Sequence, residues 1–289
     1  MCGIAGIFSL DEKPISNLKI RAKKIIENLK HRGPDGFGTW TNSKNNVLIC
    51  NTRLAIVDPQ KRSQLPFTDN EIDLLGFNGE IYNYQSLRKE FINKGVRFKT
   101  ATDTEVLYNG LKYKGKKFLK KLDGMWAFAY YNEKKKKILL SRDLLGEKHI
   151  FYCTYKKLFI FASEMNCLLS QISESIDYDY SSIKSAFQYR SCQPGKTLIQ
   201  NVYKMMPGSI IEIENGKIKK SRFLKIQPQG WLEKIAMLKD ENEFLDLYDE
   251  QISEAVCSRV PKDIDFASTL SGGIDSTLLN FYLSKNKLH

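Results

Sequence analysis

The sequence predicts an α+β fold over about the first 200 residues, followed by the start of a parallel α/β nucleotide-binding domain. Short apolar segments bounded by polar turns indicate strands, and many of them follow one another without a helix between them. Segments with helical periodicity occur between others. Near the C-terminus the order becomes apolar segment, glycine-rich loop and helix, which is typical of the beginning of a parallel sheet.

The elements of the first part follow from periodicity and from their stop signals. Apolar residues recur at helical spacing until Gly33-Pro34 ends the helix, and Thr102-Asp-Thr-Glu105 is a capping-box pattern that opens another. Aromatic and β-branched residues mark a later group of adjacent strands. The expected strands are 3–8, 47–50, 72–77, 125–131, 137–141, 149–155 and 158–162, and the expected helices are 18–29, 85–94 and one beginning at 102.

The second part begins after a change in composition. Residues from about 215 to 240 are polar and are expected to be irregular, with Gln227-Pro-Gln-Gly230 as a linker. A helix is predicted at 242–260 and a buried strand at 265–270, followed by a second helix from Ser276. We therefore expect one domain at 2–212, a connecting segment at 213–240 and an incomplete domain at 241–289.

Composition excludes several classes of protein. The chain has 289 residues, of which 42% are hydrophobic and 27% are charged, as in an ordinary globular protein. No run approaches the roughly 18 apolar residues of a membrane span, and the N-terminus lacks the basic region of a signal peptide. We expect a cytoplasmic location and no membrane partner.

The net charge of +12 raises the question of a nucleic-acid partner. The lysines are scattered or lie in short runs such as 134–137, which has apolar segments on both sides and is typical of an exposed turn. No zinc-finger, recognition-helix or RNA-binding signature is present, so we expect no nucleic-acid partner.

The cysteines predict neither a metal site nor a disulfide framework, since none forms a Cys-x-x-Cys pair. Cys2 differs from the others in its position. Removal of Met1 would leave Cys2 at the N-terminus, where its α-amine can act as the general base for its own thiol. An isolated cysteine after Met1 usually has no such role, so position alone is weak support. The six cysteines are Cys2, Cys50, Cys153, Cys167, Cys192 and Cys257.

A series of motifs in a fixed order strengthens this interpretation. Together they resemble the class II glutamine amidotransferases, whose nucleophile is an N-terminal cysteine, over most of residues 1–210. This resemblance implies a four-layer αββα fold and hydrolysis of glutamine without a cofactor. The motifs are Met1-Cys-Gly-Ile-Ala-Gly-Ile-Phe8, His31-Arg-Gly-Pro-Asp-Gly36, Arg53-Leu-Ala-Ile-Val-Asp58, Phe77-Asn-Gly-Glu-Ile-Tyr-Asn83, Thr102-Asp-Thr-Glu105, Asp123-Gly-Met-Trp-Ala-Phe128, Ser141-Arg-Asp-Leu-Leu-Gly146 and Phe161-Ala-Ser-Glu164.

The resemblance also implies roles for individual residues. The side-chain amide of Asn78 and the backbone N–H of Gly79 would hold the oxyanion formed during acyl transfer. Taken alone, Asn78-Gly79 is more typical of a hairpin turn. Arg53 would bind the α-carboxylate of glutamine with its guanidinium fork.

Further residues complete the implied glutamine pocket. Asp103 and Glu80 would hold the ammonium of glutamine, although Asp103 also fits a role in helix capping. By resemblance alone, the backbone at Ile56 and Val57 lines the same pocket.

The loop Ser271-Gly-Gly-Ile-Asp-Ser276 differs from a Walker A loop because Gly-Lys-Ser/Thr is missing. It resembles the PP-loop of ATP-pyrophosphatases, with backbone amides facing phosphate at a helix N-terminus. That resemblance implies an ATP site with a candidate Mg²⁺ ligand in Asp275 and with the backbone of Leu270 near adenine. The implied ATP-binding residues are Leu270, Ser271, Gly272, Gly273, Asp275 and Ser276.

An N-terminal-cysteine glutaminase joined to a PP-loop resembles the glutamine-dependent asparagine synthetases. The implied reaction transfers ammonia from glutamine to an aspartate activated by ATP as aspartyl adenylate, giving asparagine, AMP, pyrophosphate and glutamate. One departure is His149, where the family commonly has proline. We expect the synthetase domain to be incomplete in this chain and the chain alone to hydrolyse glutamine at most.

Three alternatives stay open from the sequence. The acceptor is another carboxylic acid, the chain is a glutaminase subunit of a separate synthetase partner, or the fold is an inactive amidotransferase that binds nucleic acid. A homodimer and a further C-terminal synthetase region also remain open.

Overall fold

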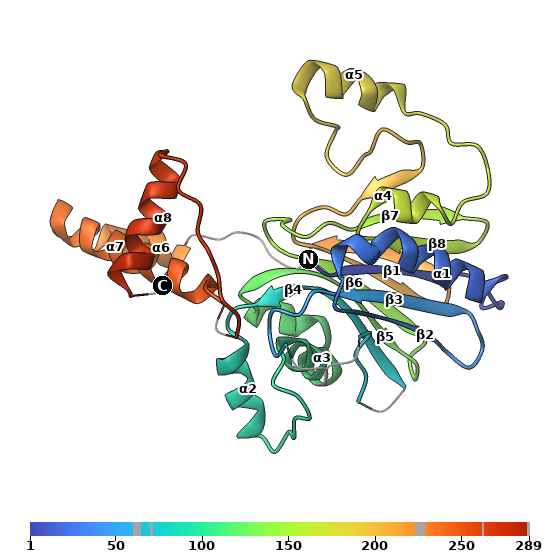
Figure 1. The fold of residues 1–289 in the computed structure, drawn as a ribbon, viewed down its shortest axis with the longest axis horizontal. Helices are drawn as coiled ribbons and strands as arrows, with labels where there is room; N and C mark the ends of the chain where they lie inside the picture. The colour runs from blue at the N-terminus through green and yellow to red at the C-terminus, as the bar shows by residue number, and fades with distance from the viewer. Residues whose placement is uncertain (60–64, 70–71, 223–228, 262, 288–289) are drawn as a thin grey trace. The chain divides into compact units, whose positions relative to one another are not determined.

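The computed structural model describes residues 1–59, 65–69, 72–222, 229–261 and 263–287. The chain divides into two compact units, and each is described by itself (Figure 1). The first comprises Met1–Ala55 and Gln60–Leu224, and the second comprises Ile56–Pro59 and Lys225–His289. Among the described residues, no helix is both long and apolar enough to cross a membrane.

The first unit is built on two antiparallel sheets. The strands of one sheet are β1 (Gly3–Ser9), β2 (Gly36–Thr41), β3 (Val47–Arg53), β7 (Phe151–Tyr155), β8 (Leu158–Ala162) and β9 (Val202–Lys204). Their order is β2-β3-β1-β8-β7-β9. The strands of the other sheet are β4 (Asp73–Ile81), β5 (Gly124–Asn132), β6 (Lys137–Arg142), β10 (Ser209–Glu214) and β11 (Lys217–Arg222). Their order is β11-β10-β6-β5-β4.

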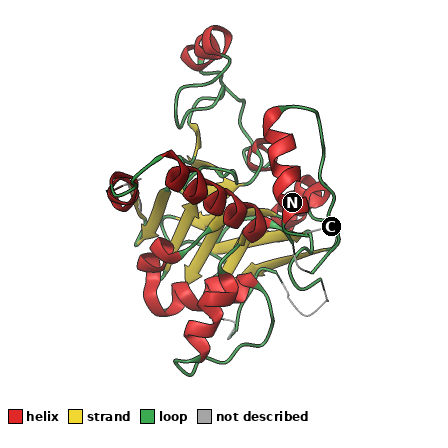
Figure 2. Cartoon of the chain, turned by 90° about the vertical axis from the view of Figure 1, so that its left-hand side faces the viewer, coloured by secondary structure: helices red, strands yellow, loops and turns green. Residues whose placement is uncertain are grey.

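Helices cover the outer faces of both sheets, so the first unit has the four layers αββα (Figure 2). The expected α+β architecture is therefore confirmed. The helices on the six-stranded sheet are α1 (Leu18–Leu29) and α4 (Met165–Leu169), with the 3-10 helix η1 (Lys30–Arg32) after α1. Those on the five-stranded sheet are α2 (Tyr84–Ile92), α3 (Asp103–Lys114) and the 3-10 helix η2 (Gly115–Lys121). A further helix, α5 (Tyr180–Tyr189), precedes β9.

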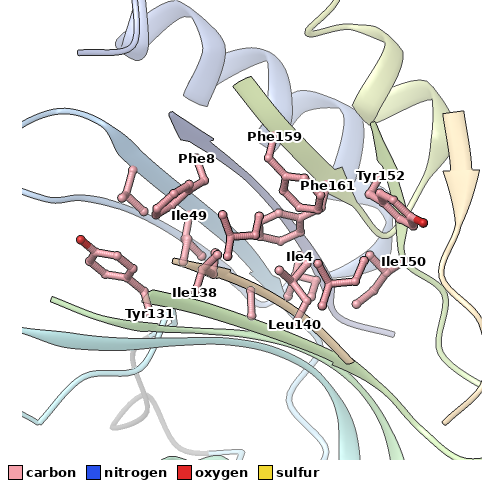
Figure 3. Packing of buried hydrophobic residues seen from close by; sticks show 14 of the residues in the cluster. Ile4, Phe8, Ile49, Tyr131, Ile138, Leu140, Ile150, Tyr152, Phe159 and Phe161 are labelled. Atoms are coloured by element: carbon pink, nitrogen blue, oxygen red, sulfur yellow. The ribbon is translucent and has the colours of Figure 1, made fainter. Parts of the chain in front are cut away.

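Alternation along the strands produces the layers, because successive side chains point to opposite faces of a sheet. In β1, Ile4 and Phe8 lie in the core between the sheets, whereas Ala5 and Ile7 pack with α1. Figure 3 shows the aromatic part of the core between the sheets, where Phe159 and Phe161 lie near Ile4. Burying each such large side chain contributes about 1.5–3 kcal/mol, so this core holds the two sheets together.

A buried asparagine adds a polar connection between the sheets. Asn51 of β3 is fully buried. Its Nδ2 donates to the carbonyl oxygens of Gly3 at 2.9 Å and Phe77 at 3.2 Å, and its Oδ1 accepts from the N–H of Phe77 at 2.8 Å. One side chain therefore fixes the start of β1 against the middle of β4.

The structure confirms the expected helices at 18–29, 85–94 and from 102, and strands at all seven expected places. It differs at 215–240, which was expected to be irregular. There β11 pairs with β10 in the five-stranded sheet, and a helix, α6 (Gln229–Ala236), replaces part of the expected linker. Residues 227 and 228 of that linker lie outside the described residues. The domain boundaries stay a prediction.

The second unit contains α6, α7 (Glu241–Arg259) and α8 (Ile274–Lys285). The carboxylate of Asp249 on α7 accepts from Tyr282 Oη at 3.0 Å and Lys285 Nζ at 2.7 Å, which ties α7 to α8. The expected buried strand at 265–270 is wrong, since the structure assigns no strand there and most of these residues are exposed. A strand needs a neighbouring strand to satisfy its backbone, and no described strand pairs with this segment.

Replacing Asn51 by alanine should lower the free energy of unfolding by about 2–4 kcal/mol, because buried backbone groups of Gly3 and Phe77 lose their partner. Urea unfolding followed by circular dichroism measures this change. The matched control is Asn28→Ala, which removes an exposed bond to the Lys24 carbonyl and should change stability by less than about 0.5 kcal/mol. Equal stability of the two variants would contradict the role given to Asn51.

Candidate active site

The thiol of Cys2 lies at the start of β1 against the backbone of Leu54. The N–H of Leu54 donates to Sγ at 3.3 Å, and Sγ lies 3.6 Å from the Leu54 carbonyl oxygen. Burial raises the pKa of the Cys2 thiol, and the Leu54 bond opposes this rise. Since the thiolate is the reactive form, a thiol in this position needs a proton acceptor.

Several motifs from the sequence hold this N-terminal strand in place. Arg32 donates from Nε to the Cys2 carbonyl oxygen at 3.0 Å and from Nη1 to Glu164 at 2.9 Å. His31 Nε2 lies 2.8 Å from the same carboxylate oxygen. Ser163 exchanges two bonds with Ile4, one from each backbone N–H. The motifs at 31–36 and 161–164 therefore position the backbone that carries Cys2.

Asn78 provides a buried amide with a free donor. It lies within β4 opposite Ala127, so the alternative of a hairpin turn at Asn78-Gly79 is wrong. The side chain is 1% exposed, and its Nδ2 has no hydrogen-bond partner in the part of the chain that the structure describes. A buried donor without a partner costs about 1–3 kcal/mol. An oxyanion would satisfy it.

Gly79 has a steric reason to be glycine. A Cβ at this position would overlap the Met125 carbonyl oxygen and would lie 2.7 Å from Trp126 Cα on the paired strand β5. The absence of a side chain therefore allows β4 and β5 to pair closely at Gly79, whose role as an oxyanion donor stays a prediction.

Asp103 is the first residue of α3, yet its carboxylate does not cap that helix. Thr102 is the N-cap, and its Oγ1 accepts from Glu105 N at 3.3 Å. Asp103 Oδ2 instead accepts from Ile81 N at 3.0 Å, at the end of β4. Burial raises the pKa of Asp103 to about 7, and the nearby Glu80 carboxylate adds to the rise.

Charged groups of the first unit affect the pKa of the Cys2 thiol. The charge of Asp103 raises the pKa of the Cys2 thiol and that of Arg53 lowers it, although burial has the larger effect. Burial also raises the pKa of Glu80. Arg53 is the last residue of β3 and is half-buried.

The structure counts Ile56–Pro59 with the second unit, where Asp58 N donates to Asp263 Oδ2 at 2.9 Å. The predicted roles of Ile56 and Val57 in the glutamine pocket therefore stay predictions.

The loop at 271–276 precedes α8 in the second unit. Ser271 Oγ lies 2.9 Å from Ser276 Oγ, and Gly272 has a φ of +80°, which favours glycine. Gly273 is the N-cap of α8 and provides no side-chain cap, so the first N–H groups of the helix remain available to a phosphate. Leu270 is 64% exposed and Asp275 is also exposed. These features fit the predicted ATP site, whose residues stay a prediction.

Sequence reasoning missed residues that position the site rather than react. Asn51 is the first polar residue after four apolar ones in its strand, which is a usable signal for a buried hydrogen-bonding role. Arg32 and Ser163 lie in recognised motifs, but their bonds to β1 depend on the tertiary fold.

Known proteins that are similar to this chain indicate its family and its fold. Residues 1–224 match the protein family described as a glutamine amidotransferase domain. A protein of Methanocaldococcus jannaschii described as a putative glutamine-hydrolyzing asparagine synthetase 2 is 30% identical over 100% of this chain and 59% of its own length. Asparagine synthetase B of Escherichia coli strain K12 is 27% identical over 99% of this chain and 45% of its own. The chain spans about half the length of the curated relatives it matches.

Among solved structures, the glutamine phosphoribosylpyrophosphate amidotransferase of B. subtilis, complexed with ADP and GMP, has a TM-score of 0.56. It is 20% identical, and the match covers 78% of this chain and 50% of that one. This similarity shows that the two proteins share a fold.

Asp103→Asn should make the free energy of unfolding less dependent on pH. The Asp103 carboxyl has a pKa of about 7 in the folded protein, whereas its ordinary value is 3.8. As the pH rises, the unfolded chain therefore loses this proton at a lower pH than the folded protein does. The stabilising contribution of the protonated form is therefore complete below about pH 4 and is lost as the pH rises through 7.

Relative to the parent, Asp103→Asn should therefore gain up to roughly 4 kcal/mol between pH 4 and pH 8, as urea unfolding at a series of pH values measures. The control is Asp123→Asn, at an exposed carboxyl. Parallel stability curves for the parent and Asp103→Asn would rule out the raised pKa.

Proposed function

Because this chain belongs to the glutamine amidotransferase domain family, we propose that its first unit hydrolyses glutamine with Cys2 as the nucleophile. One observation carries this proposal. The side-chain amide of Asn51 contacts both Gly3 and Phe77, which are the neighbours in sequence of Cys2 and Asn78. A half-buried thiol and a buried amide donor with no partner in the described part of the chain are thus held in one region by a single side chain.

The proposed reaction begins after Met1 is removed, which leaves a free amine on Cys2. That amine takes the thiol proton while Sγ bonds to the amide carbon of glutamine. Asn78 Nδ2 and the Gly79 N–H stabilise the resulting oxyanion. The tetrahedral intermediate then expels ammonia, which leaves with the proton held by the amine. Water hydrolyses the glutamyl thioester to glutamate and restores the thiol.

Charged groups select the substrate in this proposal. Arg53 binds the α-carboxylate of glutamine, and Asp103 with Glu80 binds its ammonium. A carboxyl with a pKa of about 7 is only partly ionised at neutral pH, but a nearby ammonium favours the ionised form. Glutamine therefore supplies a positive charge beside the buried carboxyl of Asp103.

We further propose that the ammonia is used to amidate aspartate activated by ATP, as the names of the relatives suggest. The loop at 271–276 would bind the phosphates of ATP, and Asp275 would bind Mg²⁺, whose charge supports adenylate formation. Support comes from the uncapped N-terminus of α8 and from the open space around Gly272.

Cys2→Ala should abolish release of glutamate from glutamine, because no other group of the site provides the nucleophile. Asn78→Ala should lower kcat by about 10²–10³-fold through loss of one oxyanion donor. Enzymatic measurement of glutamate, with intact mass to verify removal of Met1, tests both. Asn28→Ala should match the parent. Glutamate release by Cys2→Ala at the parent rate would disprove the mechanism.

The proposed acceptor is tested in a protein that extends this chain by a complete synthetase domain, by adding ATP, Mg²⁺ and a carboxylic acid and measuring AMP. AMP should form with aspartate and not with glutamate or succinate as acceptor. Formation of AMP that depends on another acid and not on aspartate would contradict asparagine as the product.

A further inference from the structure

Lys148 is a buried lysine that the proposed mechanism does not use. Its side chain is 7% exposed, although lysine is almost never buried without a partner. Among the described residues, the hydrogen-bond acceptor that the structure gives Nζ is the thioether sulfur of Met1, at 3.3 Å. A thioether is a weak acceptor, so the ammonium is poorly compensated.

The backbone of Lys148 is held firmly despite this cost. Its N–H donates to Asp143 Oδ2 at 2.9 Å, and its carbonyl accepts from Arg142 Nε at 2.7 Å. Asp143 Oδ1 also accepts from Glu147 N at 2.9 Å. The motif at 141–146 therefore builds a rigid loop that keeps the lysine beside the N-terminus.

Charged groups from several elements surround the Lys148 ammonium. Burial lowers its pKa, and the charges of the neighbouring groups act in both directions. The ammonium in turn lowers the pKa of Glu80, although burial has the larger effect and raises it. Together with Arg32, the ammonium also lowers the pKa of the N-terminal amine, which burial lowers more strongly. The groups concerned are the N-terminal amine, Cys2, Arg32, Asp35, Glu80, Asp143 and Glu147, and of these Cys2 and Asp35 raise the pKa of the amine.

We propose that Lys148 is a positioning residue of the glutaminase reaction, whose buried ammonium keeps the amine of the processed N-terminus in its proton-accepting form. This inference rests on the proposed function of Cys2. A fixed cation disfavours a second positive charge nearby, and low polarity around the pair strengthens that effect. Removal of Met1 withdraws the sulfur from the ammonium and places the amine one residue closer to the thiol.

The contact with Met1 is available to the lysine only in the unprocessed chain. Before processing, the Met1 side chain covers Nζ. After processing, the proposal places Lys148 near the amine base, which works only when it is unprotonated. The same cation that is costly to bury is therefore useful once the chain is mature.

The test is the pH profile of kcat/KM for glutamate release by the parent, Lys148→Met and Lys148→Arg, each confirmed by intact mass to lack Met1. Loss of the cation raises the pKa of the amine, so the ascending limb for Lys148→Met should move to higher pH by about one unit. Activity on the acid side of that limb should then fall roughly tenfold. Lys148→Arg should keep its limb within about 0.3 units of the parent.

The exposed lysine variant Lys13→Met is the matched control and should reproduce the parent profile. A uniform loss of activity in Lys148→Met with no movement of the limb would assign Lys148 a packing role and overturn the proposal. The proposal would also be overturned if the ascending limb of Lys148→Arg moved as far as that of Lys148→Met. Thermal unfolding by circular dichroism identifies a misfolded variant. If Lys148→Met is misfolded, the pH profile of Lys148→Arg is compared with that of the parent instead. Failure of the glutaminase proposal is distinct, since the parent itself would release no glutamate.

Discussion

The hydrogen bonds of Asn51 are the interaction on which the site depends. The two sheets pack through apolar side chains, and apolar contacts tolerate sliding because they have little directionality. The amide of Asn51 fixes the relative position of β1 and β4 through Gly3 and through both polar groups of Phe77. Cys2 and Asn78 are the adjacent residues, so the distance between the proposed nucleophile and the proposed oxyanion donor depends on this one buried side chain.

A second consequence of the fold is that several polar and charged groups of the site are buried in unfavourable surroundings. Asn78 has an amide donor with no partner among the described residues, Asp103 has a raised pKa, and Lys148 has a thioether as an acceptor. Each would be destabilising in an ordinary core. Glutamine, the substrate proposed above, would supply a hydrogen-bond acceptor for Asn78 and a countercharge for Asp103. Stability is thus reduced at the proposed site, as is common at functional sites.

Much of the first unit could be predicted from the sequence because its strands are strongly apolar and its motifs are specific. The polar strand β11 was missed since its lysines and arginine give no apolar alternation, although such charges are typical of an edge strand. The strand β2 was missed because it contains Gly36 and Gly38, and a Cβ at Gly38 would overlap the Leu65 carbonyl oxygen. Tertiary contacts, which no local pattern records, determine both. The segment 265–270 was wrongly predicted to be a strand, because an apolar composition cannot make a strand without a pairing partner.

The most direct test of this account is to mix the mature chain with glutamine, quench in acid within milliseconds and map the peptides by mass spectrometry. The account predicts a glutamyl group on the N-terminal peptide, attached to Cys2 and absent when Met1 is retained. A glutamyl group on another residue, or glutamate formed with no modification of Cys2 at any time, would contradict it.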